Sequence, residues 1–176
     1  TYKKDILTFL FLGIDKNGEV KASSNLFKGG QADALFLAVL DPGEKKISVI
    51  GINRDTMASM NVYDKNGRYS GRQTAQIALS HAYGDGLEES CENSLDAVSN
   101  LFYGLPIHGY CALNMSVVSK LNDAVGGVDV VIPESANGLE KGWTTGAEVH
   151  LEGDAAYQFI HYRDTAQEQS AEARLE

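Results

Sequence analysis

The chain has 176 residues, of which 43% are hydrophobic and 22% are charged, and its formal net charge is −9. This amount of apolar material suffices for one globular core and excludes disorder of the whole chain. The acidic balance argues against nucleic-acid binding, because the neutralisation of phosphates needs clustered Lys and Arg. The longest apolar run, 34–40, has the length of a buried strand and falls well short of the roughly 18 residues of a membrane span.

The length predicts a single domain over residues 1–176, with an acidic C-terminal arm over residues 161–176. The sequence begins at Thr1, without an initiator methionine or a secretory signal. We therefore expect an excised or processed domain, and an upstream anchor would lie outside this chain.

Three apolar segments predict strands in the first third of the chain. Residues 6–14 are almost continuously apolar, which is typical of a strand that is buried on both faces. A second buried strand is expected over 34–40 and a third over 47–52, and the turn residues at 41–46 join these two into a hairpin. Such strands need cover on both faces, so helices should follow.

Helices are indeed expected along the rest of the chain. They are predicted over residues 73–83, 87–102, 117–125 and 151–160, mostly from apolar residues three and four positions apart. Two further strands are expected over 107–113 and 128–132, and residues 138–150 should form a loop. Strands that alternate with helices after an initial hairpin predict the α/β class, with a mixed central β-sheet covered by helices on both faces.

Several residues that often carry chemistry have simpler interpretations here. Cys91 and Cys111 allow one disulfide at most, and Cys91 lies on the apolar face of a predicted helix. We favour two buried free thiols, and a disulfide stays open. Asn114 matches a glycosylation triplet, but we interpret it as the N-cap of the helix that follows.

Polar side chains border the three N-terminal strands. Asp15 ends the first strand, Asp33 opens the second, and Arg54-Asp55 closes the third. If the second strand runs against the other two, all these positions lie at one end of the sheet, where ligands gather in α/β proteins. Paired carboxylates near an arginine suit a hard divalent cation whose shell is completed by phosphate oxygens, and equally a structural ion pair.

A second group of basic side chains lies near the C-terminus. His161 and Arg163 share a face if the chain is extended there, so we expect the preceding helix to end near Ile160. A cation that complements the helix macrodipole would explain Arg163 alone. It would not explain why Arg174 follows on the same acidic arm.

Seven short motifs follow one another from about residue 6 to the end of the chain. They occupy residues 12–15, 32–37, 52–56, 82–84, 126–130, 151–157 and 162–164, and Arg174 follows them. Each motif alone is weakly specific, but their order and spacing together are specific. In this order they resemble the motifs of the LytR-CpsA-Psr family.

The resemblance implies a membrane-anchored phosphotransferase at the extracytoplasmic face of a bacterial plasma membrane. Such an enzyme moves a glycopolymer from a polyprenyl-pyrophosphate carrier onto a peptidoglycan acceptor, with Mg²⁺, or Mn²⁺ in its place, at the pyrophosphate. The implied partners are therefore the carrier-linked glycopolymer, peptidoglycan and the membrane, the last through an N-terminal helix that is not in this chain. The implied lipid tail lies in an apolar cavity between the sheet and the helices, which opens towards Arg54.

The resemblance also assigns roles to individual residues. Asp15 and Asp33 would bind the metal, and Arg54 and Arg163 would hold and polarise the pyrophosphate. Asp55 would orient Arg54 and so belong to the catalytic group. Arginine suits this role because its planar fork pairs with phosphate oxygens and stays charged. The substrate-binding set would be completed by Gln31, His161 and Arg174.

The sequence departs from the family pattern at three places within the chain. Gln31 stands where the family usually has an arginine, Asn53 where it has a proline, and His161 where it has the first arginine of a pair. The site therefore carries less fixed positive charge, which would weaken the stabilisation of a pyrophosphate transition state. Two alternatives stay open for this reason: a non-catalytic protein that binds polyprenyl phosphate or an envelope partner, and a polyprenyl-pyrophosphate pyrophosphatase.

Overall fold

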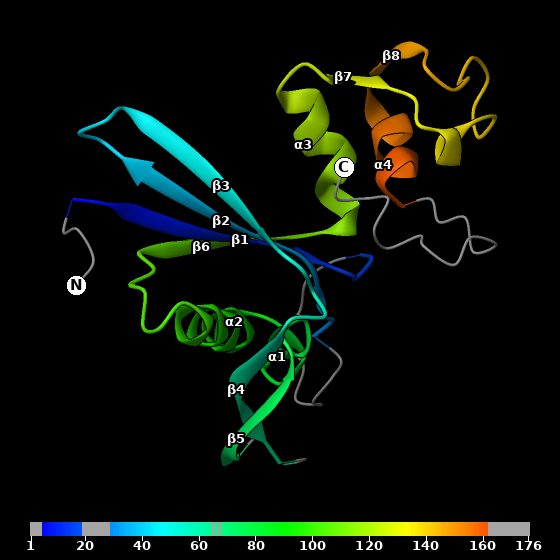
Figure 1. The fold of residues 1–176 in the computed structure, drawn as a ribbon. Helices are drawn as coiled ribbons and strands as arrows, with labels where there is room; N and C mark the ends of the chain where they lie inside the picture. Colours follow the sequence, from blue (N-terminus) through cyan, green and yellow to red (C-terminus); the bar gives the residue numbers. More distant parts are fainter. Residues whose placement is uncertain (1–4, 19–28, 65, 67, 162–176) are drawn as a thin grey trace. The chain divides into compact units, whose positions relative to one another are not determined.

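The computed structural model describes most of the chain, namely residues 5–18, 29–64, 66 and 68–161 (Figure 1). The chain forms two compact units, residues 1–116 and residues 117–176. The mixed α/β fold class is confirmed. The single-domain span of 1–176 stays a prediction.

A four-stranded mixed sheet in the order β3-β2-β1-β6 forms the centre of the first unit. Strand β1 (Leu7–Ile14) pairs antiparallel with β2 (Ala32–Asp41), and β2 pairs antiparallel with β3 (Lys46–Ile52). Strand β6 (Gly109–Asn114) lies parallel to β1. The four strands predicted for this part of the chain, and the hairpin between the second and the third, are therefore confirmed with small shifts in their bounds.

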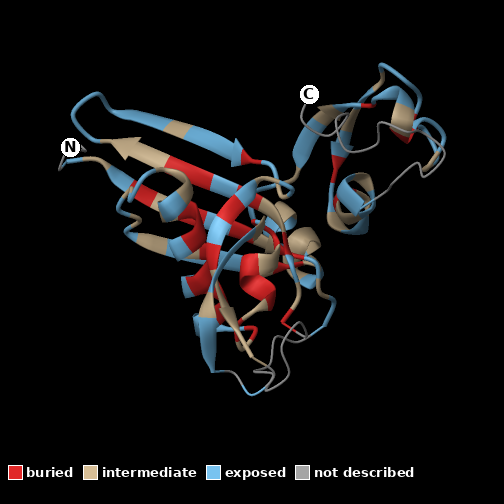
Figure 2. Cartoon of the chain, turned by 60° about the horizontal axis from the view of Figure 1, so that its bottom comes forward, coloured by how far each residue is buried: buried red, intermediate tan, exposed pale blue. Residues whose placement is uncertain are grey.

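The two faces of this sheet differ in exposure. Leu10 and Leu37 are fully buried in a core that they share with Val98 of helix α2 (Glu88–Leu101). Phe11 and Phe36 lie opposite each other in register on the other face and are 43% and 46% exposed. Buried residues gather between the sheet and the helices of this unit, whereas β3 is exposed along most of its length (Figure 2). Helical cover of the second face stays a prediction.

Helix α2 confirms the apolar stripe that was predicted for it. The helix begins after Asp85, whose carboxylate accepts hydrogen bonds from the backbone N–H groups of Leu87 at 2.7 Å and Ser90 at 3.4 Å. These bonds satisfy donors that the start of a helix otherwise leaves unpaired. The structure therefore places the start of α2 firmly beside the loop that contains Asp85.

The helix predicted over 73–83 is wrong. Strand β5 (Tyr69–Gln76) occupies the first part of this segment and pairs antiparallel with β4 (Met57–Tyr63), a strand that was not predicted. Within 73–83, helix is limited to the single turn α1 (Leu79–Ala82). Pairing with β4 overrides the weak local preference of β5 for a helix.

Strand β4 had a signal in the sequence. Ala58 and Met60 are buried, whereas Met57 and Ser59 between and beside them are exposed. This alternation has the period of two that is typical of a half-buried strand. It extends over only a few residues, so it is a much weaker signal than the longer apolar runs.

The second unit has a small core of its own. Helix α3 (Val118–Ala124) contacts helix α4 (Gly153–His161), and β7 (Val128–Val131) pairs antiparallel with β8 (Glu148–Leu151). Trp143 is 6% exposed within this core and lies edge-on to the ring of Phe159. A short 3-10 helix at Glu134–Ala136 belongs to this unit, and another at Met115–Val117 spans the point in the chain where the first unit ends.

The helices and the strand predicted within the described part of the second unit are confirmed with small shifts in their bounds, and two details need correction. Leu151, predicted as the first residue of a helix, is the last residue of β8. The segment 138–150 is a loop only as far as Ala147, because β8 begins at Glu148. No helix in the described part of the chain is long and apolar enough to cross a bilayer.

Asn114, the last residue of β6, does not cap the helix that follows, so that interpretation is wrong. Its side-chain amide donates to the carbonyl of Gly18 at 2.6 Å, and its side-chain oxygen accepts from the hydroxyl of Ser116 at 2.6 Å. Helix α3 begins after Val117 without a side-chain cap. The Asn114 side chain instead ties the end of β6 to the segment that follows β1.

Both cysteines are free, but the expectation that both are buried is wrong for Cys111. Cys111 is exposed and lies in register with Phe11, on the sheet face away from α2. Cys91 is 4% exposed, and burial raises the pKa of its thiol to about 11. Because the thiolate is the reactive form, Cys91 should be inert near neutral pH.

We expect a disulfide reagent such as DTNB to modify one thiol in the native chain and both thiols after denaturation. The absorbance of the released thiolate measures both numbers. Cys111→Ser is the matched control and should abolish the native reaction. Rapid modification of native Cys111→Ser protein would contradict the protected position of Cys91.

Candidate active site

Three strand ends bring Asp15, Asp33 and Arg54 to one edge of the first sheet. The last residue of β1 lies opposite the first residue of β2, and the last residue of β3 pairs near the same end of β2. The backbone N–H of Asp15 donates to the carbonyl of Gln31 at 3.0 Å, and the Gln31 side chain is exposed. The convergence that strand alternation predicted is confirmed for these positions.

A β-bulge determines the direction of Asp33. Gly13 pairs with Ala34 whereas Ile14 pairs with Ala32, so Asp33 is the extra residue on β2. A bulge bends the strand and re-aims a side chain, and bulges are common beside active sites. Position 13 requires glycine here, because a Cβ atom would lie 2.9 Å from the Cβ of Ala34.

Arg54 and Asp33 form an ion pair. Nη1 of Arg54 donates to Oδ2 of Asp33 at 2.8 Å, and the two side chains are 36% and 21% exposed. Since water reaches both groups, the pair contributes only about 0.2–1 kcal/mol to stability. It is therefore accessible to a ligand that arrives from solvent.

Asp55 contacts a residue that was not predicted. Its Oδ1 accepts from the side-chain amide of Gln76 at 2.9 Å, and its backbone N–H donates to Oδ1 of Asn53 at 2.9 Å. Arg54 contacts the carboxylate of Asp33. The orientation of Arg54 by Asp55 stays a prediction, and the described contacts of Asp55 join the end of β3 to β5.

The single turn α1 connects the strand ends of the site. The N–H of Ala78 donates to the carbonyl of Arg54 at 3.2 Å, and the carbonyl of Ala78 accepts from the N–H of Ala32 at 3.1 Å. His81 is 2% exposed, and its Nδ1 lies 2.9 Å from the carbonyl of Gly30. Burial lowers the pKa of His81, so its ring is neutral near pH 7.

Sequence reasoning missed Gln76, Ala78 and His81. Ala78 acts through its backbone, which every residue type shares, so no sequence signal could have found it. Gln76 was assigned to a helix, where it would not face Asp55. His81 did have a signal, since it directly precedes the tripeptide 82–84 that matches a family motif.

Asp15 and Asp33 fit a divalent cation that binds together with a phosphate. Carboxylate oxygens are the ligands that Mg²⁺ prefers. The described residues contain no group of three or more His, Cys, Asp or Glu placed to hold a metal. Two carboxylates leave most of an octahedral shell to water and to oxygens of the ligand, so the residues present suit a shared cation better than a metal bound by protein alone.

The C-terminal candidates are described only as far as His161. This residue is the last of α4, and its ring stacks on Tyr157 with 5.1 Å between the centroids. The described part of the helix thus extends one residue beyond the predicted end near Ile160. Arg163 and Arg174 lie outside the described residues, so their roles stay predictions.

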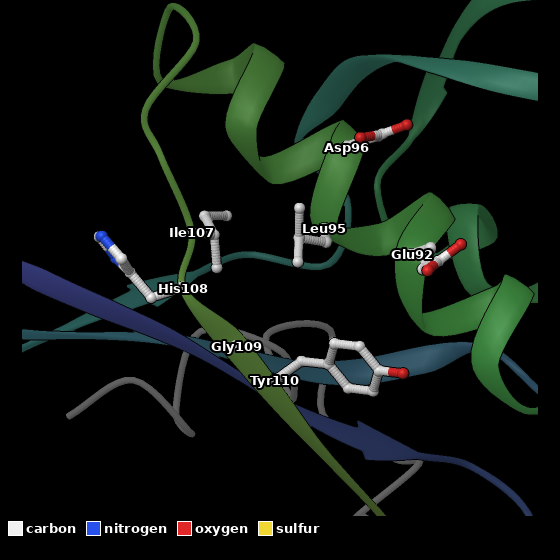
Figure 3. A pocket seen from close by; sticks show the side chains of 7 residues that line it. All are labelled: Glu92, Leu95, Asp96, Ile107, His108, Gly109 and Tyr110. Carbon is white, nitrogen blue, oxygen red and sulfur yellow. The ribbon is translucent and has the colours of Figure 1, made fainter.

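A cavity of about 360 Å³ lies between α2 and β6 (Figure 3). Leu95 and Ile107 point into its apolar part, and the carboxylates of Glu92 and Asp96 lie on α2 beside it. Its wall includes Gly109, which pairs with Phe9 near the start of β1, whereas the candidate site follows the end of that strand. This cavity therefore differs from the expected apolar cavity that opens towards Arg54, which stays a prediction.

Comparison with known proteins identifies relatives of this chain. The model of the LytR_cpsA_psr family matches residues 1–175. The polyisoprenyl-teichoic acid–peptidoglycan teichoic acid transferase TagU of Bacillus mycoides (strain KBAB4) is 31% identical over 92% of this chain and 45% of its own length. TagU of Enterococcus faecalis (strain ATCC 700802 / V583) is 27% identical over 92% of this chain and 47% of its own length. The chain thus spans less than half the length of these relatives.

Solved structures show the same fold. The crystal structure of Bacillus subtilis TagV matches 93% of this chain and 58% of its own, with a TM-score of 0.65 and 23% identity. Lin1025 of Listeria innocua matches 98% of this chain and 61% of its own, with a TM-score of 0.63 and 23% identity. At this identity the likeness concerns the fold alone. The family model, which matches nearly every residue, shows that the chain belongs to the LytR-CpsA-Psr family.

Proposed function

We propose that this chain transfers a cell-envelope glycopolymer from a polyprenyl-pyrophosphate carrier to peptidoglycan. The observation that carries the proposal is the solvent-accessible pair of Arg54 and Asp33 beside Asp15 at one sheet edge. An accessible guanidinium suits a pyrophosphate, because its fork binds two oxygens at once. The names of the curated relatives, which state a polyisoprenyl-linked teichoic acid and peptidoglycan, support the same class of reaction.

In the proposed reaction, a hydroxyl of the acceptor attacks the phosphorus that carries the glycopolymer in the carrier's pyrophosphate, and the proton of the hydroxyl passes to solvent. The P–O bond to the bridging oxygen breaks, and polyprenyl phosphate leaves with that oxygen. Arg54 and Arg163 bind oxygens on which negative charge develops, which is the interaction that lowers such a barrier most. Asp55 would belong to the same catalytic group by orienting Arg54, and the proposed binding set is completed by Gln31, His161 and Arg174.

Asp15 and Asp33 would hold Mg²⁺, or Mn²⁺ in its place. A divalent cation at this position supplies Lewis acidity that offsets the charge of the transferring phosphoryl group. Because the proposed carrier is a membrane lipid and the proposed acceptor is peptidoglycan, we place the domain at the extracytoplasmic face of a bacterial plasma membrane and propose that it is anchored there.

Two competing functions follow from the reduced positive charge of the site. Gln31 and His161 stand where arginines would strengthen the binding of a pyrophosphate. A protein that binds polyprenyl phosphate without turnover needs only part of that charge. A pyrophosphatase needs the same binding site but uses water as its acceptor.

We expect the chain to bind Mn²⁺ weakly alone and at least about tenfold more tightly with geranyl pyrophosphate, since phosphate oxygens complete the metal's shell. Calorimetric titration measures both affinities. The double variant Asp15→Ala, Asp33→Ala should lose the binding, whereas Glu44→Ala, in the exposed turn between β2 and β3, should keep it. Equal affinity in the double variant would remove these carboxylates from the metal site.

An assay with carrier-linked glycopolymer and peptidoglycan separates the three functions. Polymer that becomes attached to peptidoglycan supports the transferase. Release of polymer without an acceptor identifies a pyrophosphatase, and tight binding of the carrier without any product identifies a binding protein. Either of the last two results would overturn the proposed transfer.

A further inference from the structure

We propose that His81 is a positioning residue for the candidate active site, because it holds the carbonyl of Gly30 and so fixes the start of β2 against the end of β1. The inference rests on the proposed function, since it concerns the same site. His81 contacts this part of the chain at the backbone carbonyl of Gly30, so its effect would pass through the backbone.

The contacts of His81 specify one tautomer. A carbonyl oxygen can only accept a hydrogen bond, so Nδ1, which lies 2.9 Å from the oxygen of Gly30, carries the proton. Nε2 then has a lone pair, and it lies 3.9 Å from Sγ of Cys91, a weak thiol donor. Burial disfavours a second proton on the ring and lowers the pKa of His81. The side chain is therefore a neutral donor aimed at Gly30.

Gly30 is packed against the strand end that carries Asp15. Its φ of +86° lies in the left-handed region that favours glycine. A Cβ atom on Gly30 would lie 2.8 Å from Cγ2 of Ile14 and 3.4 Å from the carbonyl oxygen of Asp15. A Cβ atom on the preceding Gly29 would lie 2.6 Å from Cα of Gly86. The two glycines are thus held between the end of β1 and the turn that precedes α2.

Three hydrogen bonds hold the three residues that lead to Asp33. His81 donates to the carbonyl of Gly30, the N–H of Asp15 donates to the carbonyl of Gln31, and the N–H of Ala32 donates to the carbonyl of Ala78. The second bond joins the residue that follows β1 to the residue that precedes β2. The first joins the segment before β2 to α1, and the third joins the start of β2 to Ala78, the N-cap of α1, whose N–H also donates to the carbonyl of Arg54.

Loss of the hydrogen bond from His81 would release Gly30, the first of these three residues. Asp33 sits on a bulge, where the regular ladder is interrupted, so its position depends more than usual on the residues that precede it. The distance between the carboxylates of Asp15 and Asp33 would then vary, and a cation shared with a phosphate tolerates little variation of that kind.

Two substitutions separate this role from simple packing. Asn keeps a nitrogen donor at the place of Nδ1, whereas Gln fills more of the volume but puts its nitrogen near the place of Nε2. We expect His81→Asn to bind geranyl pyrophosphate in the presence of Mn²⁺ within about threefold of the wild type, and His81→Gln to lose at least about tenfold. The reverse order would show that His81 only fills space and would overturn the proposal.

A second measurement does not depend on a ligand. Long-range ¹H–¹⁵N spectra of the wild-type chain should show the proton of His81 on Nδ1, and a proton on Nε2 would overturn the proposal even if a variant failed to fold. Exchange of the Asp15 and Ala32 amide protons should quicken in His81→Gln and stay near the wild-type rate in His81→Asn. Val98→Ala, a core change away from the site, is the control for a general loss of stability.

The two measurements distinguish a failure of the proposed function from a failure of the proposed role of His81. If the wild-type chain binds no geranyl pyrophosphate, the proposed function fails, and the tautomer and exchange rates still decide the role of His81. If the ligand binds but His81→Gln exchanges and binds like the wild type, the positioning role fails and the proposed function stands.

Discussion

Replacement of Arg54 by lysine is expected to lower glycopolymer transfer by about a hundredfold, with little change in the melting temperature. The guanidinium fork can hold two phosphate oxygens, whereas an ammonium group offers a single point of charge. Removal of one well-placed donor to a developing charge costs catalysis about 10²–10³-fold. Stability should change by less than about 1 kcal/mol, because the pair of Arg54 with Asp33 is exposed to water.

Arg72→Lys provides the matched control for this prediction. Arg72 is an exposed arginine on β5, and it should tolerate the same change without loss of transfer. Rates are measured with carrier-linked polymer, and folding is checked by circular dichroism. Full activity in Arg54→Lys would mean that Arg54 does not bind the transferring group through its fork.

Gly84→Ala is expected to lower the melting temperature by roughly 5–10 °C. A Cβ atom at this position would lie 2.4 Å from the backbone nitrogen of Ser90 and 2.5 Å from its Cα. These atoms belong to the first turn of α2 and cannot rotate away as a flexible side chain could. The helix would have to shift away from α1, at a cost of about 2–3 kcal/mol.

The control for this glycine is Gly51 in β3. A Cβ atom there would meet Phe36 at 3.9 Å, which is ordinary van der Waals contact. Gly51→Ala should therefore change stability by less than about 1 kcal/mol. Thermal denaturation followed by circular dichroism measures both variants, and a Gly84→Ala chain that melts with the wild type would contradict the close approach of α1 and α2.

The fold was predictable where the apolar pattern is long. Strand β1 is almost continuously apolar, and α2 carries its apolar residues at helical spacing over its whole length, so each could be assigned from sequence. The β4–β5 hairpin could not be assigned in the same way. Thr74 and Gln76 of β5 are exposed, so this strand carries a weak pattern, and its conformation depends on pairing with β4.

The candidate site was predictable only in outline. Alternating strand directions bring Asp15, Asp33 and Arg54 to one edge, and that inference needs nothing beyond the chain order of the strands. The partner of each side chain depends on register, and a shift of one residue reverses the face of a strand. The bulge at Asp33 is such a shift, so the sequence offered an ion pair with Arg54 as one alternative but could not identify Asp33 as its partner, nor foresee the contact of Gln76 with Asp55.

The ion pair of Arg54 with Asp33 influences which ligands can bind at this end of the sheet. A phosphate that arrives alone must draw Arg54 away from Asp33 and then face the negative charge of that carboxylate. A cation that arrives alone must draw Asp33 away and leave a guanidinium facing a second positive charge. When the two arrive together, each side chain exchanges one partner for another of the same sign. The site thus favours a cation and a phosphate that bind together. It discriminates against the far more abundant single ions of the surrounding solution.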